Sequence, residues 1–134
     1  MDMMIKGRVI SKGKAEGEAL VSREAISFLG EVDARTGVVV NPKHQLFKKS
    51  IAGKVLVFPR GRGSTVGSYV LYQLKKNGKA PKAIINEEAE LIVVVGAIIS
   101  EIPMMDKLER NTFKLIKDGS KVVVDGDKGV VVIK

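Results

Sequence analysis

Cysteine and tryptophan are absent from this 134-residue chain, and histidine occurs once, as His44. The lack of cysteine excludes disulfides, thiolate catalysis and any zinc or iron–sulfur site held by thiolates of this chain. A single histidine cannot assemble a metal site by itself either. We therefore expect no metal to be bound by this chain alone.

Long apolar segments are also missing. The longest, residues 91–99, is far shorter than the ~20 residues that a helix needs to cross a bilayer. Residues 1–7 lack the apolar centre of a secretory signal. Hydrophobic residues nevertheless make up 45% of the chain, which is enough for a folded core at this length. These features predict one ordered domain, residues 1–134, in the cytoplasm.

Acidic residues are absent from a long central window. No Asp or Glu occurs between Ala34 and Asn86, in a chain that has 23 basic residues, 15 acidic residues and a net charge of +8. The basic residues of this window are Arg35, Lys43, Lys48, Lys49, Lys54, Arg60, Arg62, Lys75, Lys76, Lys79 and Lys82. A field of one sign concentrates ligands of the opposite charge. The window indicates an anionic ligand, although a solubilising surface or a nucleic-acid patch would have the same composition.

A glycine-rich turn lies inside this window. Residues 54–59 predict a buried strand, residues 60–68 form the turn, and a helix follows up to Asn77-Gly78, which supplies a left-handed stop. The apolar face of that helix consists of Val66, Tyr69, Val70 and Leu74. A strand-to-helix turn of this kind leaves backbone N–H groups unpaired and directed at whatever lies before the helix.

The turn carries two hydroxyls and two guanidinium groups. Ser64 and Thr65 stand at the predicted helix start, flanked by Arg60 and Arg62. This combination predicts a site for a phosphate or carboxylate, with a hydroxyl placed to act on the bound molecule. The alternative for Ser64 is a plain helix N-cap.

The remaining segments predict a mixed α/β fold with a barrel-like sheet. Expected strands are residues 5–10, 17–21, 27–30, 38–40, 83–85 and 102–105, with turns at 12–17 and 32–37, a polar loop at 41–52 and a Val-rich hairpin at 121–133. Asn86 can cap a helix whose first turn holds Glu87, Glu88 and Glu90. Residues 91–100 continue that helix or form a buried strand, and we favour the helix because of the cap and the acidic residues. His44 is a possible interface or substrate contact, whereas Asp33, Asn41 and Ser50 are typical of turns and caps.

Five segments form a recognisable series along the chain: Ser27-Phe-Leu-Gly30, Val32-Asp-Ala-Arg-Thr-Gly37, Asn41-Pro-Lys-His44, residues 50–71 and residues 96–103. In this order they resemble the small subunit of the aconitase X type, the archaeal phosphomevalonate dehydratase small subunit family. The resemblance covers essentially the whole chain and is most specific in residues 50–71.

This resemblance implies a swivelling β/β/α domain, equivalent to the mobile fourth domain of aconitases. It implies a heterodimer with a large subunit that holds a [4Fe-4S] cluster, and dehydration of (R)-5-phosphomevalonate to trans-anhydromevalonate 5-phosphate in isoprenoid synthesis. The family's catalytic base is a serine in the glycine-rich turn, so its role carries over to Ser64, and Arg60, Arg62, Gly63 and Thr65 become expected substrate contacts. Thr65 stands where many relatives have a second serine.

Other functions remain open from the residues alone. Residues 116–133 are also similar to swivelling domains that carry phosphohistidine, but residues 63–68 contain no histidine, so that likeness supports the fold and not the function. Six aromatic residues without a basic–aromatic pattern provide poorly for nucleic-acid stacking. A dehydratase subunit for a different hydroxy acid, or a non-catalytic phosphate-binding swivel module, would fit the same turn.

Overall fold

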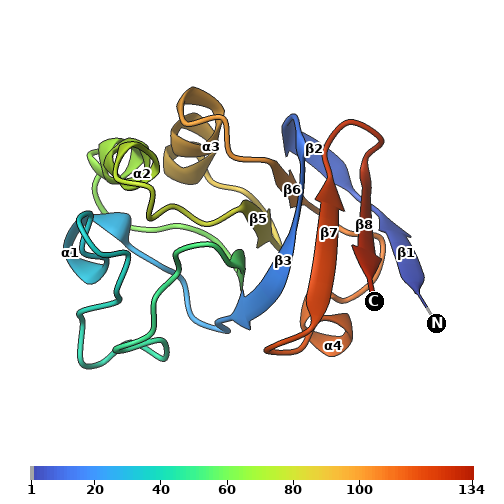
Figure 1. Cartoon of the computed structure of the whole chain (residues 1–134), viewed down its shortest axis with the longest axis horizontal. Helices are drawn as coiled ribbons and strands as arrows, with labels where there is room; N and C mark the ends of the chain where they lie inside the picture. Colours follow the sequence, from blue (N-terminus) through green and yellow to red (C-terminus); the bar gives the residue numbers. More distant parts are fainter. Residues whose placement is uncertain (1) are drawn as a thin grey trace.

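An eight-stranded mixed sheet, flanked by helices, organises the chain (Figure 1). The computed structural model describes residues 2–134. The strands are β1 (Met3–Lys6), β2 (Arg8–Ser11), β3 (Lys14–Val21), β4 (Val55–Phe58), β5 (Ala83–Asn86), β6 (Met104–Asp106), β7 (Lys121–Asp125) and β8 (Val130–Ile133). The helices are α1 (Phe28–Glu31), α2 (Gly67–Lys76), α3 (Leu91–Ile99) and α4 (Thr112–Leu115).

The sheet curls into a nearly closed barrel. Its order is β1-β8-β7-β3-β4-β5-β6-β2, with parallel pairing from β3 to β6 and antiparallel pairing on either side. The two outermost strands, β1 and β2, are consecutive in the chain and meet at Gly7, whose N–H donates to Gly129 O at 3.2 Å. One stretch of chain therefore joins both ends of the sheet.

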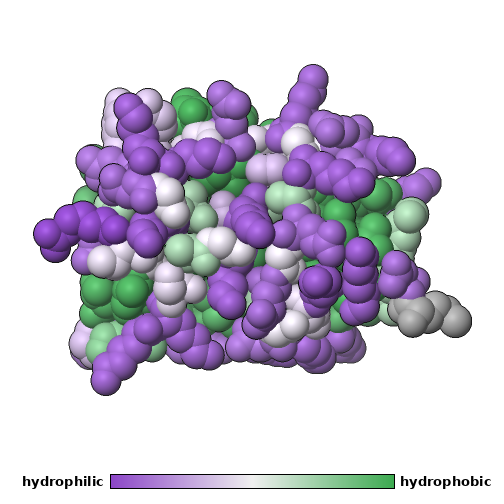
Figure 2. Space-filling model, viewed as in Figure 1, coloured by the Kyte–Doolittle hydropathy of each residue, from purple (hydrophilic) through white to green (hydrophobic). Residues whose placement is uncertain are grey.

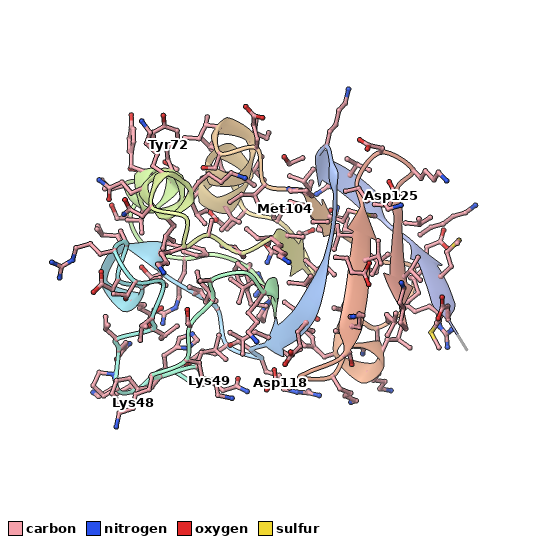
Figure 3. All side chains as sticks on the ribbon, viewed as in Figure 1. Lys48, Lys49, Tyr72, Met104, Asp118 and Asp125 are labelled. Atoms are coloured by element: carbon pink, nitrogen blue, oxygen red, sulfur yellow. The ribbon has the colours of Figure 1, made fainter. Side chains whose placement is uncertain are left out.

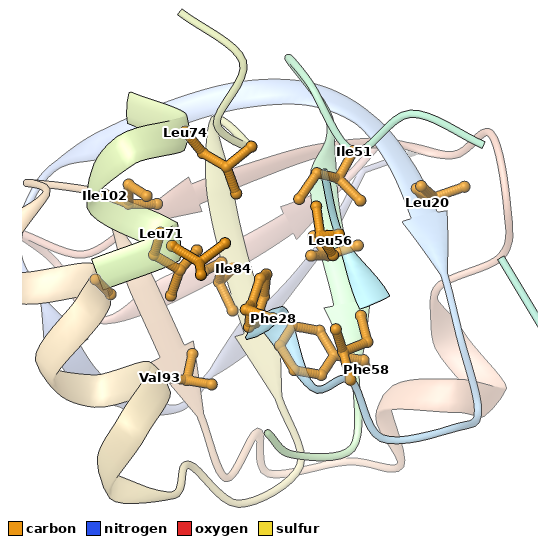
Figure 4. Packing of buried hydrophobic residues seen from close by; sticks show 14 of the residues in the cluster. Leu20, Phe28, Ile51, Leu56, Phe58, Leu71, Leu74, Ile84, Val93 and Ile102 are labelled. Carbon is orange, nitrogen blue, oxygen red and sulfur yellow. The ribbon is translucent and has the colours of Figure 1, made fainter. Parts of the chain in front are cut away.

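Alternating residues of the parallel strands face two separate cores. On β4, Leu56 and Phe58 pack into the core beneath α2 and α3, whereas Val55 and Val57 face the barrel interior with residues of β7, β8 and α4. Every residue of β4 is buried, as expected for a parallel strand covered on both faces. Figure 4 shows the first core, in which the Phe28 and Phe58 rings meet edge to face at 5.9 Å.

The predicted fold class is confirmed, and so are the central strand, the helix after it and the C-terminal hairpin. The helix expected at residues 91–100 is also present, but its cap was predicted wrongly. Asn86 is a fully buried member of β5, and Glu90 is the residue that accepts from Ile92 N at 2.9 Å and Val93 N at 2.8 Å.

Four other predictions need correction. The strand expected at 38–40 does not form, because Val38 and Val39 make isolated bridges to Ser50 and Val32 instead. The strand expected at residues 5–10 is divided at Gly7, because the chain leaves β8 there and begins to pair with β6. The turn expected at 12–17 is too long, because β3 starts at Lys14 and pairs along β7. The strand expected at 27–30 is a helical turn in which Gly30 adopts a φ of 95°.

Candidate functional site

The glycine-rich turn leaves β4 at the carboxyl end of the parallel strands, the edge at which open α/β sheets commonly bind ligands. Its glycines permit close packing on both sides. A Cβ at Gly61 would collide with Glu90 and Val93 at the start of α3, and a Cβ at Gly63 would collide with the Ser27 hydroxyl. Gly63 also has a φ of +88°, which favours glycine. The turn is therefore wedged between α3 and the segment before α1.

Backbone donors are available in this turn, as predicted. Within the described part of the chain, the N–H groups of Gly63, Ser64 and Thr65 have no hydrogen-bond acceptor. The turn continues into α2 through bonds from Gly67 N to Ser64 O at 3.0 Å and from Ser68 Oγ to Thr65 O at 2.9 Å. Successive free donors just before a helix are typical of anion-binding turns.

Ser64 is exposed, and its oxygen is already engaged with one donor. Val66 N donates to Ser64 Oγ at 3.1 Å, and the residue at the N-cap position of α2 is Val66, which has no side-chain cap. Ser64 therefore closes a local turn and is not the N-cap itself. Since its oxygen accepts a hydrogen bond, the hydroxyl proton remains free to be given away.

Arg62 is held from one side by a buried carboxylate. Its Nη2 donates to Glu31 Oε2 at 2.8 Å, and its main-chain N–H donates to Ile26 O at 3.0 Å. The Arg62 side chain is 50% exposed and that of Glu31 only 7%, so part of the guanidinium remains open to a ligand. Arg60 is also exposed, and its side chain has no ion pair or hydrogen bond within residues 2–134.

Glu31 binds three donors at once. Besides Arg62, Oε1 accepts from Ser27 N at 2.7 Å and Oε2 accepts from Asn41 Nδ2 at 2.7 Å. Burial alone raises the pKa of Glu31, but the hydrogen bonds from Ser27 and Asn41 and the charge of Arg62 outweigh it and leave the pKa below its ordinary value. Glu31 is therefore ionised at neutral pH.

Sequence reasoning missed Glu31 and only half explained Asn41. Asn41 Oδ1 accepts from Lys43 N at 3.0 Å, the turn role that was predicted, while its amide nitrogen binds Glu31. Asp33 and Ser50 close turns as expected, by accepting from Arg35 N and Ala52 N. The available signal for Glu31 was weak: it is one of two acids, with Asp33, that stand just before the window of eleven cations.

His44 proves to be a buried structural residue in this chain. Its Nε2 lies 3.0 Å from Ala25 O, and its Nδ1 accepts from Leu46 N at 3.0 Å. Because Nδ1 is the acceptor, the proton belongs on Nε2, which then donates to Ala25. Only 4% of His44 is exposed, so the substrate contact considered from the sequence has no accessible ring nitrogen here.

The basic window does not form one patch around the turn. Lys49 pairs with Asp118 at 3.6 Å and Lys54 with Glu18 at 3.7 Å, so acids outside the window neutralise part of it. In Figure 3, Lys48, Lys49 and Asp118 lie along the lower edge, far from Tyr72 on α2. The space-filling view likewise shows hydrophilic side chains spread over the whole face (Figure 2). The positive charges relevant to the site are therefore those of the turn itself, Arg60 and Arg62.

An apolar groove of about 270 Å³ adjoins the turn, between α2 and α3. Its lining residues are Thr65, Val66, Ser68, Tyr69, Leu91, Ile92 and Val95. Leu91 is 74% exposed and Tyr69 65%, unusually open for large apolar side chains. Thr65 and Val66, which line the groove, directly follow Ser64 in the chain.

The described residues contain neither a cluster of metal-binding side chains nor a membrane-spanning helix. No cluster of three or more His, Asp or Glu side chains that could hold a metal ion occurs in residues 2–134. In the same part of the chain, no helix combines the length and the apolar character required for a membrane span.

Comparison with known families decides the classification. A family described as the aconitase X swivel domain matches residues 4–133. The chain belongs to this family. Its fold agrees with the crystal structure of Thermococcus kodakaraensis aconitase X in the holo form, with a TM-score of 0.93, 58% identity and 98% of each chain covered.

Curated relatives bear a more specific name. The phosphomevalonate dehydratase small subunit of Methanosarcina mazei is 65% identical over 126 residues, covering 94% of this chain and 88% of that protein. The protein of the same name from Thermococcus kodakarensis is 60% identical over 131 residues, covering 98% of this chain and 96% of the relative. At this level of identity, this chain and the two relatives share the aconitase X swivel fold, and this chain corresponds to the small subunit.

Proposed function

We propose that this chain is the small subunit of a phosphomevalonate dehydratase. With a large subunit it removes water from (R)-5-phosphomevalonate to give trans-anhydromevalonate 5-phosphate. The relatives named above support the reaction. The observation that carries the role of this chain is the Ser64 turn, which combines an exposed hydroxyl, three unpaired N–H groups and two arginines.

Ser64 first loses its hydroxyl proton to solvent, and the resulting alkoxide accepts the proton from the carbon adjacent to the departing hydroxyl, which restores the neutral serine. A serine is a weak base unless its alkoxide is stabilised, and a helix N-terminus supplies at most ~2 kcal/mol, or about 1.5 pKa units. The N–H of Val66 already points at Ser64 Oγ and binds an alkoxide more strongly than a hydroxyl. Arg62 and cations of the partner supply the remaining stabilisation.

Substrate anions bind to the free donors of the turn. Main-chain N–H groups of residues 63–65 and the open side of Arg62 present positive partial and full charges at one place. A carboxylate held there places the neighbouring carbon beside Ser64 Oγ. Arg60 is free to order on the substrate or on the partner.

A large subunit completes the site. The leaving hydroxyl of a dehydration is stabilised by a Lewis acid, which a [4Fe-4S] cluster supplies when bound. This chain has no cysteine to hold such a cluster, so its ligands belong to the partner. The exposed apolar groove beside Ser64 supports the partner's docking on this face, because covering it also excludes water from the turn.

Reconstitution tests this proposal directly. The full chain, the large subunit and their mixture are each assayed with (R)-5-phosphomevalonate, and iron is measured in each sample. The expected result is turnover only in the mixture, with iron only in samples that contain the large subunit. Turnover by this chain alone, or no turnover by an iron-replete mixture, would contradict the proposal.

A further inference from the structure

We infer that Glu31 is a positioning residue for the dehydration: it holds the Arg62 guanidinium in one orientation at the rim of the Ser64 turn. The inference rests on the proposed function for the identity of the reaction. It adds a residue outside the turn to the machinery and assigns that residue a role that acts through another side chain.

The first argument is the geometry of the pair. Glu31 Oε2 accepts from Arg62 Nη2 at 2.8 Å, and Arg62 Nε lies 3.5 Å from Ala25 O. Both contacts lie on the same side of the guanidinium. An arginine has five N–H donors in a rigid plane, so fixing one side leaves the Nη1 donors in a defined direction.

The second argument is that Glu31 is itself held rigidly. Ser27 N and Asn41 Nδ2 donate to its two oxygens at 2.7 Å each, and its carboxylate is 7% exposed. A buried carboxylate is costly unless its oxygens are fully hydrogen-bonded. These two bonds give each carboxylate oxygen one donor besides Arg62 and restrict where the carboxylate points.

The third argument is that the turn is packed directly against the segment that precedes Glu31. The Ser27 hydroxyl packs against Gly63 with no room for a Cβ, and Ile26 pairs with the chain at Gly61. A shift of Glu31 relative to Ser64 would require this packing to open. Arg62 is therefore held against the same packed segment as the Ser64 hydroxyl. Less side-chain entropy is lost when an anion binds to both.

One measurement on the full chain tests the contact without depending on activity. In an NMR spectrum of Arg side-chain Nε–H groups, Arg62 should give a protected signal, distinct from the averaged signals of exposed arginines. Glu31→Gln keeps the size of the side chain but replaces one accepting oxygen by an amide NH2, which cannot accept from Ser27 N, Asn41 Nδ2 or Arg62 Nη2. With the negative charge and this acceptor lost, the Arg62 signal should average. An unchanged Arg62 signal in Glu31→Gln would overturn the inference.

A double-mutant cycle on the reconstituted complex tests the function. Glu31→Gln should lower kcat/KM by up to ~10²-fold, the effect of misplacing a positioning group. In the Arg62→Ala background the same change should alter kcat/KM by less than about twofold, because Glu31 acts on catalysis through the Arg62 side chain, which is then absent. Equal losses in both backgrounds, or no loss in either, would overturn the inference.

The Arg8–Asp106 pair is a matched control. It too joins a half-exposed arginine to a buried carboxylate at 2.7 Å, and Asp106 also accepts a main-chain N–H, that of Ala89. Asp106→Asn should lower the thermal midpoint, and any effect on kcat/KM should be the same with Arg62 or with Arg62→Ala. Since wild-type turnover is measured beside the variants, a wrong substrate assignment is recognised separately from a wrong role for Glu31.

Discussion

Two arginines flank the Ser64 turn, but their surroundings differ. Arg62 is tied to Glu31, while the Arg60 side chain has no partner within residues 2–134. A tethered arginine has already lost much of its rotamer freedom, whereas a free one must be ordered when the substrate binds. We therefore expect the two to contribute unequally to catalysis.

The predicted inequality is measurable by alanine substitution in the reconstituted complex. Arg62→Ala should cost about 2–4 kcal/mol of transition-state stabilisation, the range for a lost oxyanion donor, and Arg60→Ala should cost less. Arg35→Ala is the control, since Arg35 is 88% exposed and pairs only with Asp33. Wild-type kcat/KM in both variants would place the anion site elsewhere.

At the residue scale, the sequence was informative where chemistry is local. Ser64, Arg60 and Arg62 are neighbours in the chain, so a strand–turn–helix pattern was enough to bring them together. Glu31 reaches Arg62, 31 positions further along the chain, only because the chain returns from α1 past the turn, and Asn41 contributes by donating to Glu31. No periodicity or spacing encodes such a contact.

At the element scale, α3 illustrates how a correct helix can be predicted with the wrong beginning. Acidic residues before an apolar run suggested a helix, and the run itself is too short and too β-branched to decide by pattern. Asn86 was chosen as the cap because it is a good capping type, but its position opposite Phe58 in the sheet buries it completely. Strand pairing overrode local preference.

The correction makes a testable claim about the stability of α3. Glu90→Ala removes the acceptor for Ile92 N and Val93 N, and it should lower the free energy of unfolding by about 1 kcal/mol. Glu87→Ala removes a carboxylate of the same charge from the preceding loop without removing that cap. Urea unfolding of the two full-chain variants should separate them, and equal stabilities would show that Glu90 is not the effective cap.

At the scale of the whole molecule, the barrel provides the scaffold and the side covered by α2 and α3 carries the candidate site. The hairpin of β7 and β8 lies between β1 and β3 in the sheet, and two Val-rich runs around a glycine-containing turn made it predictable. The division of the first strand at Gly7 was not predictable, because it depends on the sheet closing on itself. The rigid barrel supports an edge on which the Ser64 turn, the Glu31 segment and the apolar groove lie together.

That arrangement assigns Ser64 a chemical role, and one substitution in the reconstituted complex tests it. Ser64→Ala removes the oxygen that accepts from Val66 N, and Ser50→Ala removes an oxygen in the same relation to Ala52 N. Each should cost about 1 kcal/mol of stability at most. Only Ser64→Ala should lower kcat, by ~10²–10⁴-fold, as expected for a lost general base. A Ser64→Ala complex with near-normal kcat would contradict the account.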